Sequence, residues 1–222
     1  MKNVLITGIS GIIGCVIAKD LEKDYQIYGL DLKQRQDANI RLADISDFNQ
    51  VRTVFGKLPQ LDAIIHLAAD AYPFAAWNLV LQHNVVGTRN IYECAKEFNV
   101  KKVIFASSTH VVGKYPGYPF KINNSQRKLS VDDPLRPDEF YGWSKASGEI
   151  LARLYFDLYD ISTTVLRIGH VLVPGQKRDL DLEKLELTNA DLMKFVRKGL
   201  VETGFNAYFA VSEHEEGFLE SI

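Results

Sequence analysis

The segment from Tyr141 to Lys145 places a phenol and an ammonium group four residues apart. Residues at i and i+4 lie on the same face of a helix, so both side chains can reach one pocket. A free tyrosine titrates at about 10 and is a poor base at neutral pH, whereas a fixed positive charge beside it favours the phenolate. The pair therefore predicts a general base, Tyr141, whose pKa is lowered by Lys145. Because an exposed helix turn can carry the same two residues, this interpretation depends on the rest of the chain.

A glycine-rich turn, TGISGIIG at residues 7–14, joins the first predicted strand to the first predicted helix. Gly8 can make the tight turn, Gly11 lets the backbone approach a pyrophosphate, and Gly14 allows close packing of the helix on the strand. The N-terminus of the helix then offers amide donors and the positive end of its dipole to the phosphates. The spacing differs by one residue from the GxGxxG fingerprint, so a purely structural turn is the alternative.

Acidic residues end the next two predicted strands. Asp31 lies 17 residues after Gly14, close to the offset expected for the acid that holds the adenosine ribose hydroxyls. A carboxylate there would repel the additional phosphate of NADP, so NAD is favoured, although Lys33 and Arg35 lie nearby. Asp44 ends the third strand and can receive the adenine amino group or, alternatively, cap a helix.

Strand-like and helix-like segments alternate from the first residue. The predicted strands lie near 2–7, 25–31, 39–43, 61–67, 102–107, 162–168 and 206–211. The predicted helices lie near 11–23, 47–57, 75–98 (with a possible break), 140–160 and 188–202. Strands such as Val103-Ile104-Phe105-Ala106 are continuous apolar runs, typical of strands that are covered on both faces. The alternation predicts an α/β protein with a Rossmann-type, doubly wound parallel sheet.

The chain divides into two predicted regions. Residues 1–170 form the dinucleotide-binding Rossmann domain, and residues 171–222 form a small C-terminal substrate-binding portion packed on the same domain. Two long loops, 113–138 and 172–187, follow the C-terminal ends of predicted strands, where ligands bind in such sheets. Helix start signals stand at Ser46-Asp47 and at Thr188-Asn189-Ala190-Asp191.

The composition limits the classes of function. A chain of 222 residues with 46% hydrophobic and 24% charged residues suffices for one well-cored globular domain. The net charge of −2 gives no case for nucleic-acid binding. No apolar run approaches membrane-spanning length, and the chain starts directly on a strand without a signal peptide. The two cysteines, Cys15 and Cys94, lack CxxC spacing, so we expect buried helical thiols, no metal site and a cytoplasmic location.

In their order along the chain, these segments resemble the extended short-chain dehydrogenase/reductase (NAD-dependent epimerase/dehydratase) family. The matching segments are TGxxGxxG at 7–14, Asp31, Asp44-Ile45, His66-Leu67-Ala68-Ala69, Asn84-Val85-Val86-Gly87-Thr88, Phe105-Ala106-Ser107-Ser108 and Tyr141 to Lys145. The resemblance implies bound NAD and three catalytic residues. Ser108 and Tyr141 would contact the reacting oxygen, and Lys145 would hold the nicotinamide ribose. The implied cofactor-binding residues are Gly8, Gly11, Ile12, Ile13, Gly14, Asp31, Asp44, Ile45, Leu67, Ala68, Ala69, Asn84, Tyr141, Lys145 and Ile168.

Within the family, the chain is similar to uronate dehydrogenases and related archaeal NAD-dependent sugar dehydrogenases. The segments that carry this likeness are ASSTHVVG at 106–113, PLRPD at 134–138 and LRIG at 166–169. In that group the anomeric hydroxyl of a sugar is oxidised to a lactone. The implied substrate-binding residues are Ser108, Thr109, His110, Tyr141, His170 and Arg178, with an ordinary loop histidine as the alternative for His110.

The chain departs from the uronate pattern at several positions, which leaves the sugar open. Thr109 stands where an asparagine is expected, while Ala71 and His170 replace serines. Only Lys177 and Arg178 approximate the arginine that would bind a uronate carboxylate. The two loops carry Lys114, Lys121, Arg127, Lys128, Lys177 and Arg178. These cations can receive a sugar carboxylate or phosphate, or they can simply be solvated.

Three functions fit the sequence. The leading one is an NAD-dependent dehydrogenase that oxidises a hydroxyl of a sugar, sugar acid or sugar phosphate, with Tyr141 as the base and Ser108 orienting the oxygen. The second is a sugar epimerase or dehydratase that reduces and reoxidises NAD within one turnover. The third is a non-catalytic dinucleotide sensor, which would need the glycines but not the three catalytic residues. We expect no nucleic-acid or membrane partner, and pairing of copies through the long helices, as is common in such enzymes.

Overall fold

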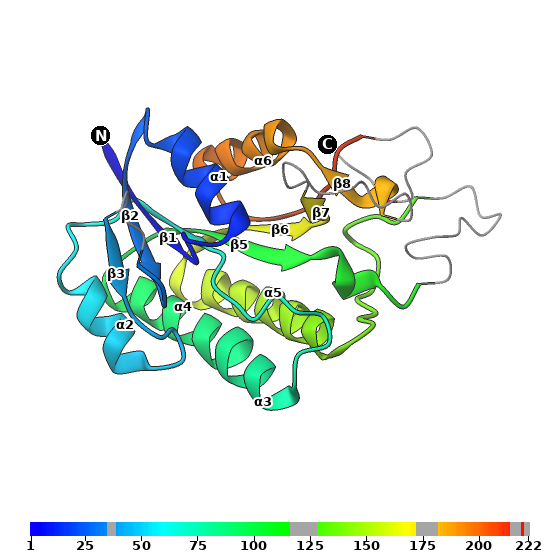
Figure 1. Ribbon diagram of the computed structural model, residues 1–222, viewed down its shortest axis with the longest axis horizontal. Helices are drawn as coiled ribbons and strands as arrows, with labels where there is room; N and C mark the ends of the chain where they lie inside the picture. Colours follow the sequence, from blue (N-terminus) through cyan, green and yellow to red (C-terminus); the bar gives the residue numbers. More distant parts are fainter. Residues whose placement is uncertain (35–38, 116–127, 172–181, 214–218, 220–222) are drawn as a thin grey trace.

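The computed structural model describes residues 1–34, 39–115, 128–171, 182–213 and 219 (Figure 1). Within these residues, seven strands form one parallel sheet in the order β3-β2-β1-β4-β5-β6-β9. The strands are β1 Lys2–Thr7, β2 Tyr25–Asp31, β3 Ile40–Leu42, β4 Ala63–His66, β5 Lys102–Ser108, β6 Ser162–Ile168 and β9 Phe205–Ala210. From β1 the chain runs outward through β2 and β3, then returns to β4 on the other side of β1. This confirms the predicted Rossmann-type, doubly wound sheet.

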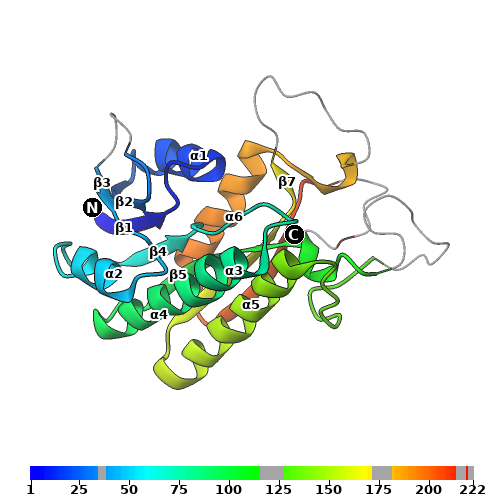
Figure 2. The same cartoon turned by 60° about the horizontal axis from the view of Figure 1, so that its bottom comes forward.

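Helices cover both faces of the sheet (Figures 1 and 2). The helices α1 (Ile12–Leu21) and α6 (Asn189–Val201) lie on one face. The other face carries α2 (Phe48–Phe55), α4 (Gly87–Glu97) and α5 (Phe140–Tyr159). Successive strand residues point to opposite faces, so Val4 and Ile6 join the first core while Leu5 joins the second. Both faces are buried, which is why the strands are continuous apolar runs in the sequence.

Two helices begin at the residues that the start signals indicated. Asp47 caps α2, where its carboxylate accepts hydrogen bonds from the backbone amides of Asn49 and Gln50. Thr188 caps α6, where its hydroxyl oxygen accepts from the amide of Asp191. Such caps satisfy amides that have no partner inside the helix and contribute about 1 kcal/mol each.

The region predicted as a helix with a possible break over 75–98 contains three different helical segments. These are α3 (Trp77–Leu79), a π-helical segment η1 (Val80–Val86) and α4. In η1 the side chain of Asn84 is buried, donates to the backbone carbonyl of Asp70 and to Ser144 Oγ, and accepts from the Asp70 amide. The widened turn therefore connects the segment after β4 to α5, and π-helical turns of this kind are frequent at functional sites.

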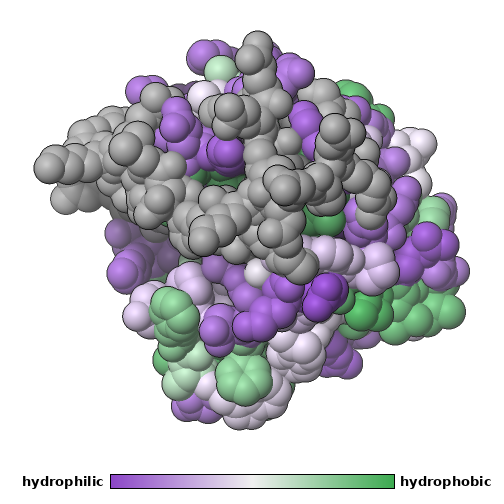
Figure 3. All heavy atoms as spheres, turned by 90° about the vertical axis from the view of Figure 1, so that its right-hand side faces the viewer, coloured by the Kyte–Doolittle hydropathy of each residue, from purple (hydrophilic) through white to green (hydrophobic). Residues whose placement is uncertain are grey.

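Aromatic side chains join α3 to the start of α5. The ring of Trp77 lies 5.2 Å from both Phe140 and Trp143, measured between ring centroids. Figure 3 views the molecule from the right-hand side of Figure 1 and shows apolar residues along the lower edge of that face, where α3 and the start of α5 lie. These contacts support the first turn of α5, which carries Tyr141.

The C-terminal portion contributes to the same sheet. After β6, a short strand β7 (His170–Val171) pairs with β8 (Glu186–Leu187), which follows the single turn η3 (Glu183–Leu185). The chain then forms α6 and returns to the edge of the main sheet as β9. The sequence did not predict the β7–β8 pair, because each of these strands has only two residues.

The expectation of two buried thiols is correct for Cys94 and wrong for Cys15. Cys94 has no exposed surface, and burial raises the pKa of its thiol to about 12, so it is unreactive. Cys15 is only half-buried, because it lies in the first turns of α1 at the edge of the sheet, where its thiol donates to the carbonyls of Ile9 and Ser10. None of the helices in the described residues is both long and apolar enough to span a membrane.

Candidate active site

A cleft of about 740 Å³ lies at the carboxyl ends of the central strands. This volume falls within the usual range for ligand pockets, about 300–1,000 Å³. The cleft lies where the strand order reverses at β1, the position at which ligands bind to doubly wound sheets. The residues lining the cleft include fourteen of the fifteen predicted cofactor residues, Asn84 being the exception. The side chain of Asn84 instead holds the wall of the cleft by binding Asp70.

The glycines of the 7–14 turn are required by close backbone contacts. Gly8 has φ +72°, a conformation that other residues rarely adopt. A Cβ atom on Gly8 would lie 2.8 Å from the amide nitrogen of Ala68, and one on Gly14 would lie 2.4 Å from the Gly8 carbonyl oxygen. The turn is therefore closed on the strand side by the segment that follows β4 and on the helix side by its own backbone. Its outer side faces the cleft.

The residues at this end of the cleft fit a dinucleotide. Gly11 is the N-cap of α1, and no side chain among the described residues caps this helix, so its first amides are available to phosphate oxygens. The carboxylate of Asp31 accepts from the backbone amides of Ser10 and Lys33, which hold it at the rim of the turn. These two bonds leave lone pairs on the carboxylate for a pair of ribose hydroxyls.

Asp44 also lines this end of the cleft. Its Oδ1 accepts from the backbone amide and the hydroxyl of Ser46, so the carboxylate closes a turn before α2. The cap of α2 is Asp47, which removes the alternative that Asp44 itself caps this helix. Ile45 follows Asp44 and lines the cleft as well.

Two consecutive serines at the end of β5 have different partners. The Ser107 hydroxyl donates to the carboxylate of Glu149 inside the protein. Ser108 lines the cleft with Tyr141 and lies close enough to lower the pKa of the phenol, and its Oγ accepts from the amide of His110. Both serines line the cleft, but the Ser107 hydroxyl is engaged by Glu149, so Ser108 is the better placed to serve a ligand. The structure thus brings Ser108 and Tyr141 together, as the sequence predicted.

Lys145 lies one helical turn after Tyr141, and both line the cleft. Its Nζ atom donates to the carbonyl oxygen of Ala106 at 2.8 Å and lies 5.5 Å from the centre of the Phe105 ring. Burial lowers the pKa of this ammonium group to about 8, because an apolar environment disfavours the charged form.

The predicted lowering of the Tyr141 pKa is wrong. Burial raises the pKa of this phenol, and the carboxylates of Asp138 and Asp70 raise it further, while the hydrogen bond with Ser108 lowers it. Lys145 Nζ lies 5.8 Å from the centre of the phenol ring and is bound to Ala106. Desolvation and then two nearby negative charges therefore raise the pKa, and Lys145 is not among the causes of the shift, which the i, i+4 spacing alone could not reveal.

Behind Lys145 lies His66, a fully buried histidine at the end of β4. Burial and the nearby Lys145 charge lower the pKa of its imidazole to about 3. Its Nδ1 lies 2.7 Å from Thr7 Oγ1, and its Nε2 lies 3.1 Å from Thr88 Oγ1. His66 is thus a neutral structural residue that connects β1 to α4 beneath the glycine turn.

At the other end of the cleft, His110 pairs with Asp138. His110 belongs to the short 3₁₀-helix η2 (Thr109–Val112), and its Nδ1 lies 2.8 Å from Asp138 Oδ2. The imidazole ring also meets the Tyr141 ring edge-on, with centroids 5.6 Å apart. The sequence predicted His110 at the substrate but did not predict Asp138, because the chain between them includes a long loop that pattern alone does not place.

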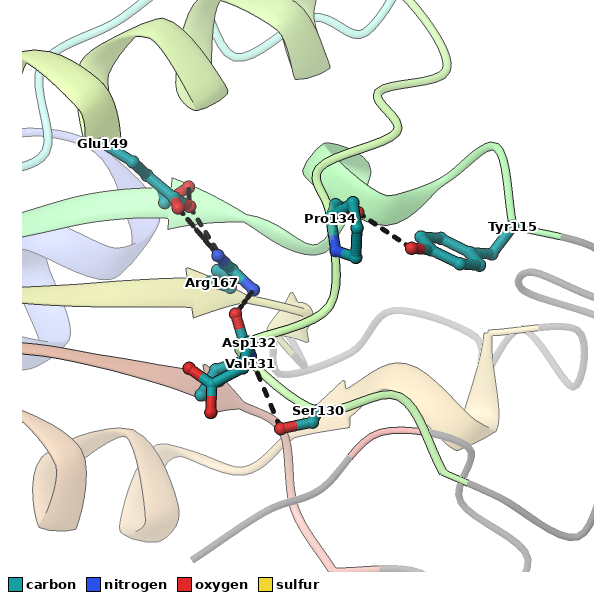
Figure 4. A network of polar contacts seen from close by, with 8 residues as sticks. Tyr115, Ser130, Val131, Asp132, Pro134, Glu149 and Arg167 are labelled. Atoms are coloured by element: carbon teal, nitrogen blue, oxygen red, sulfur yellow. Dashed lines mark hydrogen bonds and ion pairs between the residues drawn. The ribbon is translucent and has the colours of Figure 1, made fainter.

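The segment that carries Asp138 is anchored from inside the protein (Figure 4). The guanidinium of Arg167 in β6 binds the Glu149 carboxylate and donates from Nη1 to the carbonyl oxygen of Val131 at 3.0 Å. A second contact, from the hydroxyl of Tyr115 to the carbonyl of Pro134, holds the segment further along. Figure 4 shows Arg167 lying between the helix that carries Glu149 and this loop.

The remaining predicted substrate residues have different placements. His170 lines the cleft at the start of β7, whereas Thr109 is buried and does not line it. Arg178 lies outside the described residues, as do Lys121, Arg127 and Lys177. Lys114 and Lys128 are exposed. The structure adds cleft residues that the sequence did not single out, notably Ser10, Asp70, His83 and Gly169.

A protein-family model supports the interpretation that the cleft binds a dinucleotide. The model described as the NAD dependent epimerase/dehydratase family matches residues 4–195, which include the glycine turn, β5 and α5. The chain belongs to this family. The family membership confirms the predicted NAD cofactor and the predicted NAD-dependent enzyme of the extended short-chain dehydrogenase/reductase type.

Several relatives within the family are sugar dehydrogenases. L-arabinose 1-dehydrogenase (NAD(P)(+)) from Haloferax volcanii is 31% identical over 81% of this chain and 71% of its own length. The NAD-dependent glucose-6-phosphate dehydrogenase of the same organism is 34% identical over 77% of this chain and 69% of its own length. Among solved structures, a mutant of uronate dehydrogenase from Agrobacterium tumefaciens complexed with NAD superimposes with a TM-score of 0.84 and 27% identity, over 99% of this chain and 80% of that one.

Proposed function

We propose that this member of the epimerase/dehydratase family is an NAD-dependent dehydrogenase that oxidises a hydroxyl group of a sugar or sugar acid. The observation that carries the proposal is the placement of Ser108, Tyr141 and Lys145 together in a cleft whose far end is formed by the glycine turn and Asp31. The three relatives reported above, named for arabinose, glucose 6-phosphate and uronate, support the choice of a sugar.

In the proposed reaction the residues of this chain handle the proton and the geometry. Ser108 orients the hydroxyl oxygen by hydrogen bonding, and Tyr141 takes its proton. NAD, held by the glycine turn and Asp31, would supply the acceptor for the hydride that leaves the carbon bearing this hydroxyl. The positive charge of Lys145 stabilises the phenolate that forms, which matters because burial and two carboxylates raise the pKa of Tyr141. Oxidation at the anomeric carbon would give a lactone.

A substrate screen that follows NADH formation tests this proposal. The panel contains glucuronate, galacturonate, glucose, glucose 6-phosphate, arabinose and xylose. Tyr141→Phe should bind NAD like the wild type but lose turnover by a factor of about 10²–10⁴, the usual contribution of a general base. Tyr72→Phe is the matched control, because Tyr72 is an exposed tyrosine of the segment after β4. Unchanged turnover in Tyr141→Phe would show that Tyr141 is not the base.

The same screen separates the alternative functions. An epimerase or dehydratase would form product without net NADH, and a dinucleotide sensor would bind NAD without product. A substrate with a carboxylate or phosphate would be favoured if Lys177 and Arg178 receive an anion, and its KM would then rise steeply with salt. Equal activity on arabinose and glucose 6-phosphate would refute the hypothesis of an anion site but not the proposed dehydrogenase activity.

We place the reaction in the cytoplasm, where Cys15 and Cys94 remain reduced.

A further inference from the structure

The contact between His110 and Asp138 determines which nitrogen of the imidazole ring carries the proton, and the proposed reaction does not yet use this feature. A carboxylate only accepts hydrogen bonds, so at 2.8 Å the Nδ1 atom of His110 must be the protonated nitrogen. In the neutral imidazole the proton on Nδ1 leaves a lone pair on Nε2. Since His110 lines the cleft beside Tyr141, this ring can present an acceptor to a ligand there.

Asp138 is held in place by unusually close packing. A Cβ atom on Gly113 would lie 2.2 Å from Asp138 Oδ2, and one on Gly142 would lie 3.0 Å from Asp138 Oδ1 and 2.6 Å from the His110 carbonyl oxygen. Glycine at both positions therefore leaves room for the carboxylate. Oδ1 of Asp138 is buried and has no hydrogen-bond partner among the described residues, so the carboxylate contacts His110 through Oδ2.

Backbone bonds fix the approach of this segment to η2. The amide of Arg136 donates to the carbonyl of Val111, and the amide of Lys114 donates to the carbonyl of Arg136, both at 2.8 Å. Together with the bond from Arg167 to Val131, these contacts keep Asp138 in register with His110. A carboxylate so constrained can select one tautomer of the histidine with little entropic cost.

We propose that Asp138 is a positioning residue that fixes the Nδ1–H tautomer of His110, so that Nε2 accepts a hydrogen bond from a hydroxyl of the sugar. The inference rests on the proposed function for the identity of the ligand. It names one requirement on that ligand: a hydroxyl donor next to the one that reacts. It also makes the substrate role of His110 depend on a residue that does not touch the substrate.

The tautomer can be tested without any substrate. In two-bond ¹H–¹⁵N spectra of histidine-labelled protein at a pH where the ring is neutral, the His110 signals should show a protonated Nδ1 and an unprotonated Nε2. In Asp138→Asn the amide group can donate to Nδ1 instead, so the Nε2–H form should gain population. A wild-type His110 that carries its proton on Nε2, or an Asp138→Asn spectrum identical to the wild type, would overturn the proposal.

The catalytic consequence is tested by a double-mutant cycle on whichever sugar of the panel is oxidised. Asp138→Asn should lower kcat/KM by about tenfold or more, the effect of one hydrogen bond, and leave the Kd of NAD unchanged. In a His110→Gln background the same substitution should have almost no further effect, because Asp138 acts through His110. Asp138 also raises the pKa of Tyr141, so removing the charge of Asp138 would by itself favour the phenolate form of the base. A loss of activity in Asp138→Asn therefore cannot arise from that charge effect.

Asp132→Asn is the matched control, because it removes the same charge from an exposed position of the same loop and should leave kcat/KM unchanged. Additive losses in the double mutant would show that Asp138 acts independently of His110 and would refute the positioning role. If the wild-type protein reduces NAD with none of the sugars in the panel, the proposed function fails. The imidazole spectra still decide the tautomer of His110 in that case.

Discussion

Arg167 in β6 and Glu149 in α5 form an ion pair in which both side chains are almost completely buried, at 5% and 8% exposure. The pair joins the sheet to the helix that carries Tyr141 and Lys145, and Arg167 also lies 5.2 Å from the ring of Phe209 in β9. Each partner therefore depends on the other to compensate a charge that water does not reach.

Arg167→Met should destabilise the protein by about 3–5 kcal/mol, because it leaves the Glu149 carboxylate buried without its partner. Arg153→Met is the control, since Arg153 forms an exposed pair with Asp157 and should change the stability by less than about 1 kcal/mol. Urea unfolding of both variants gives the comparison. Equal midpoints for the two variants would mean that the buried pair contributes no more than a surface pair.

Lys145→Met should abolish turnover and yet stabilise the fold at neutral pH. The pKa of Lys145 is about 8 in the folded protein against an ordinary value of 10.5, so the buried charge costs stability below pH 8. This cost disappears as the pH rises from about 8 to 10.5, where the lysine loses its proton in both states. We expect a gain of about 2 kcal/mol at pH 7 and none near pH 10.5, measured by urea unfolding. A loss at pH 7 would mean that the bond to Ala106 outweighs desolvation.

Acid should destabilise the protein through His66. Its pKa of about 3 lies far below the ordinary value of 6.5, so the unfolded chain binds a proton in this interval that the folded protein does not. Stability is therefore lost as the pH falls from 6.5 towards 3, by a few kcal/mol on the order of the pKa difference. The difference in unfolding free energy between the wild type and His66→Gln should shrink over this range. Above pH 7 the same difference reports only the packing cost of the substitution and serves as the baseline.

Asp31→Asn should shift the enzyme towards NADP. The amide side chain can still accept from the amide of Ser10, but it no longer repels the additional phosphate. We expect the ratio of kcat/KM for NADP to that for NAD to rise by about tenfold or more. Asp44 lies at the same end of the cleft, so Asp44→Asn should weaken the binding of both NAD and NADP without changing the ratio of their kcat/KM values. A ratio that stays constant in Asp31→Asn would show that Asp31 does not contact the ribose.

The sequence contains enough information for the sheet because local rules decide it, and the ordered motifs were enough to indicate most of the residues that line the cleft. Buried parallel strands read as apolar runs, and the caps Asp47 and Thr188 mark where helices begin. The π-helical turn at Val80–Val86 was not predictable, since it accompanies the tertiary bonds of Asn84 with Asp70 and Ser144. No local pattern records such bonds.

The part of the site that was missed depends on contacts between distant segments. Asp138 reaches His110 across 28 residues, and Asp70 reaches the vicinity of Tyr141 only because the chain turns after β4. Burial first, and then these two carboxylates, explain the wrong expectation for the Tyr141 pKa, because the sequence shows the lysine at i+4 and reveals neither the burial of the phenol nor the distant charges.

Arg167 binds the loop through the main-chain oxygen of Val131, so the contact does not depend on which side chain stands at that position. A carbonyl is present on every residue, and mutations at 131 and around it can accumulate without loss of this attachment. The rest of this segment is thereby free to vary while Tyr141 and the glycine turn stay where they are. A single buried guanidinium in this way lets one wall of the cleft evolve without disturbing the other.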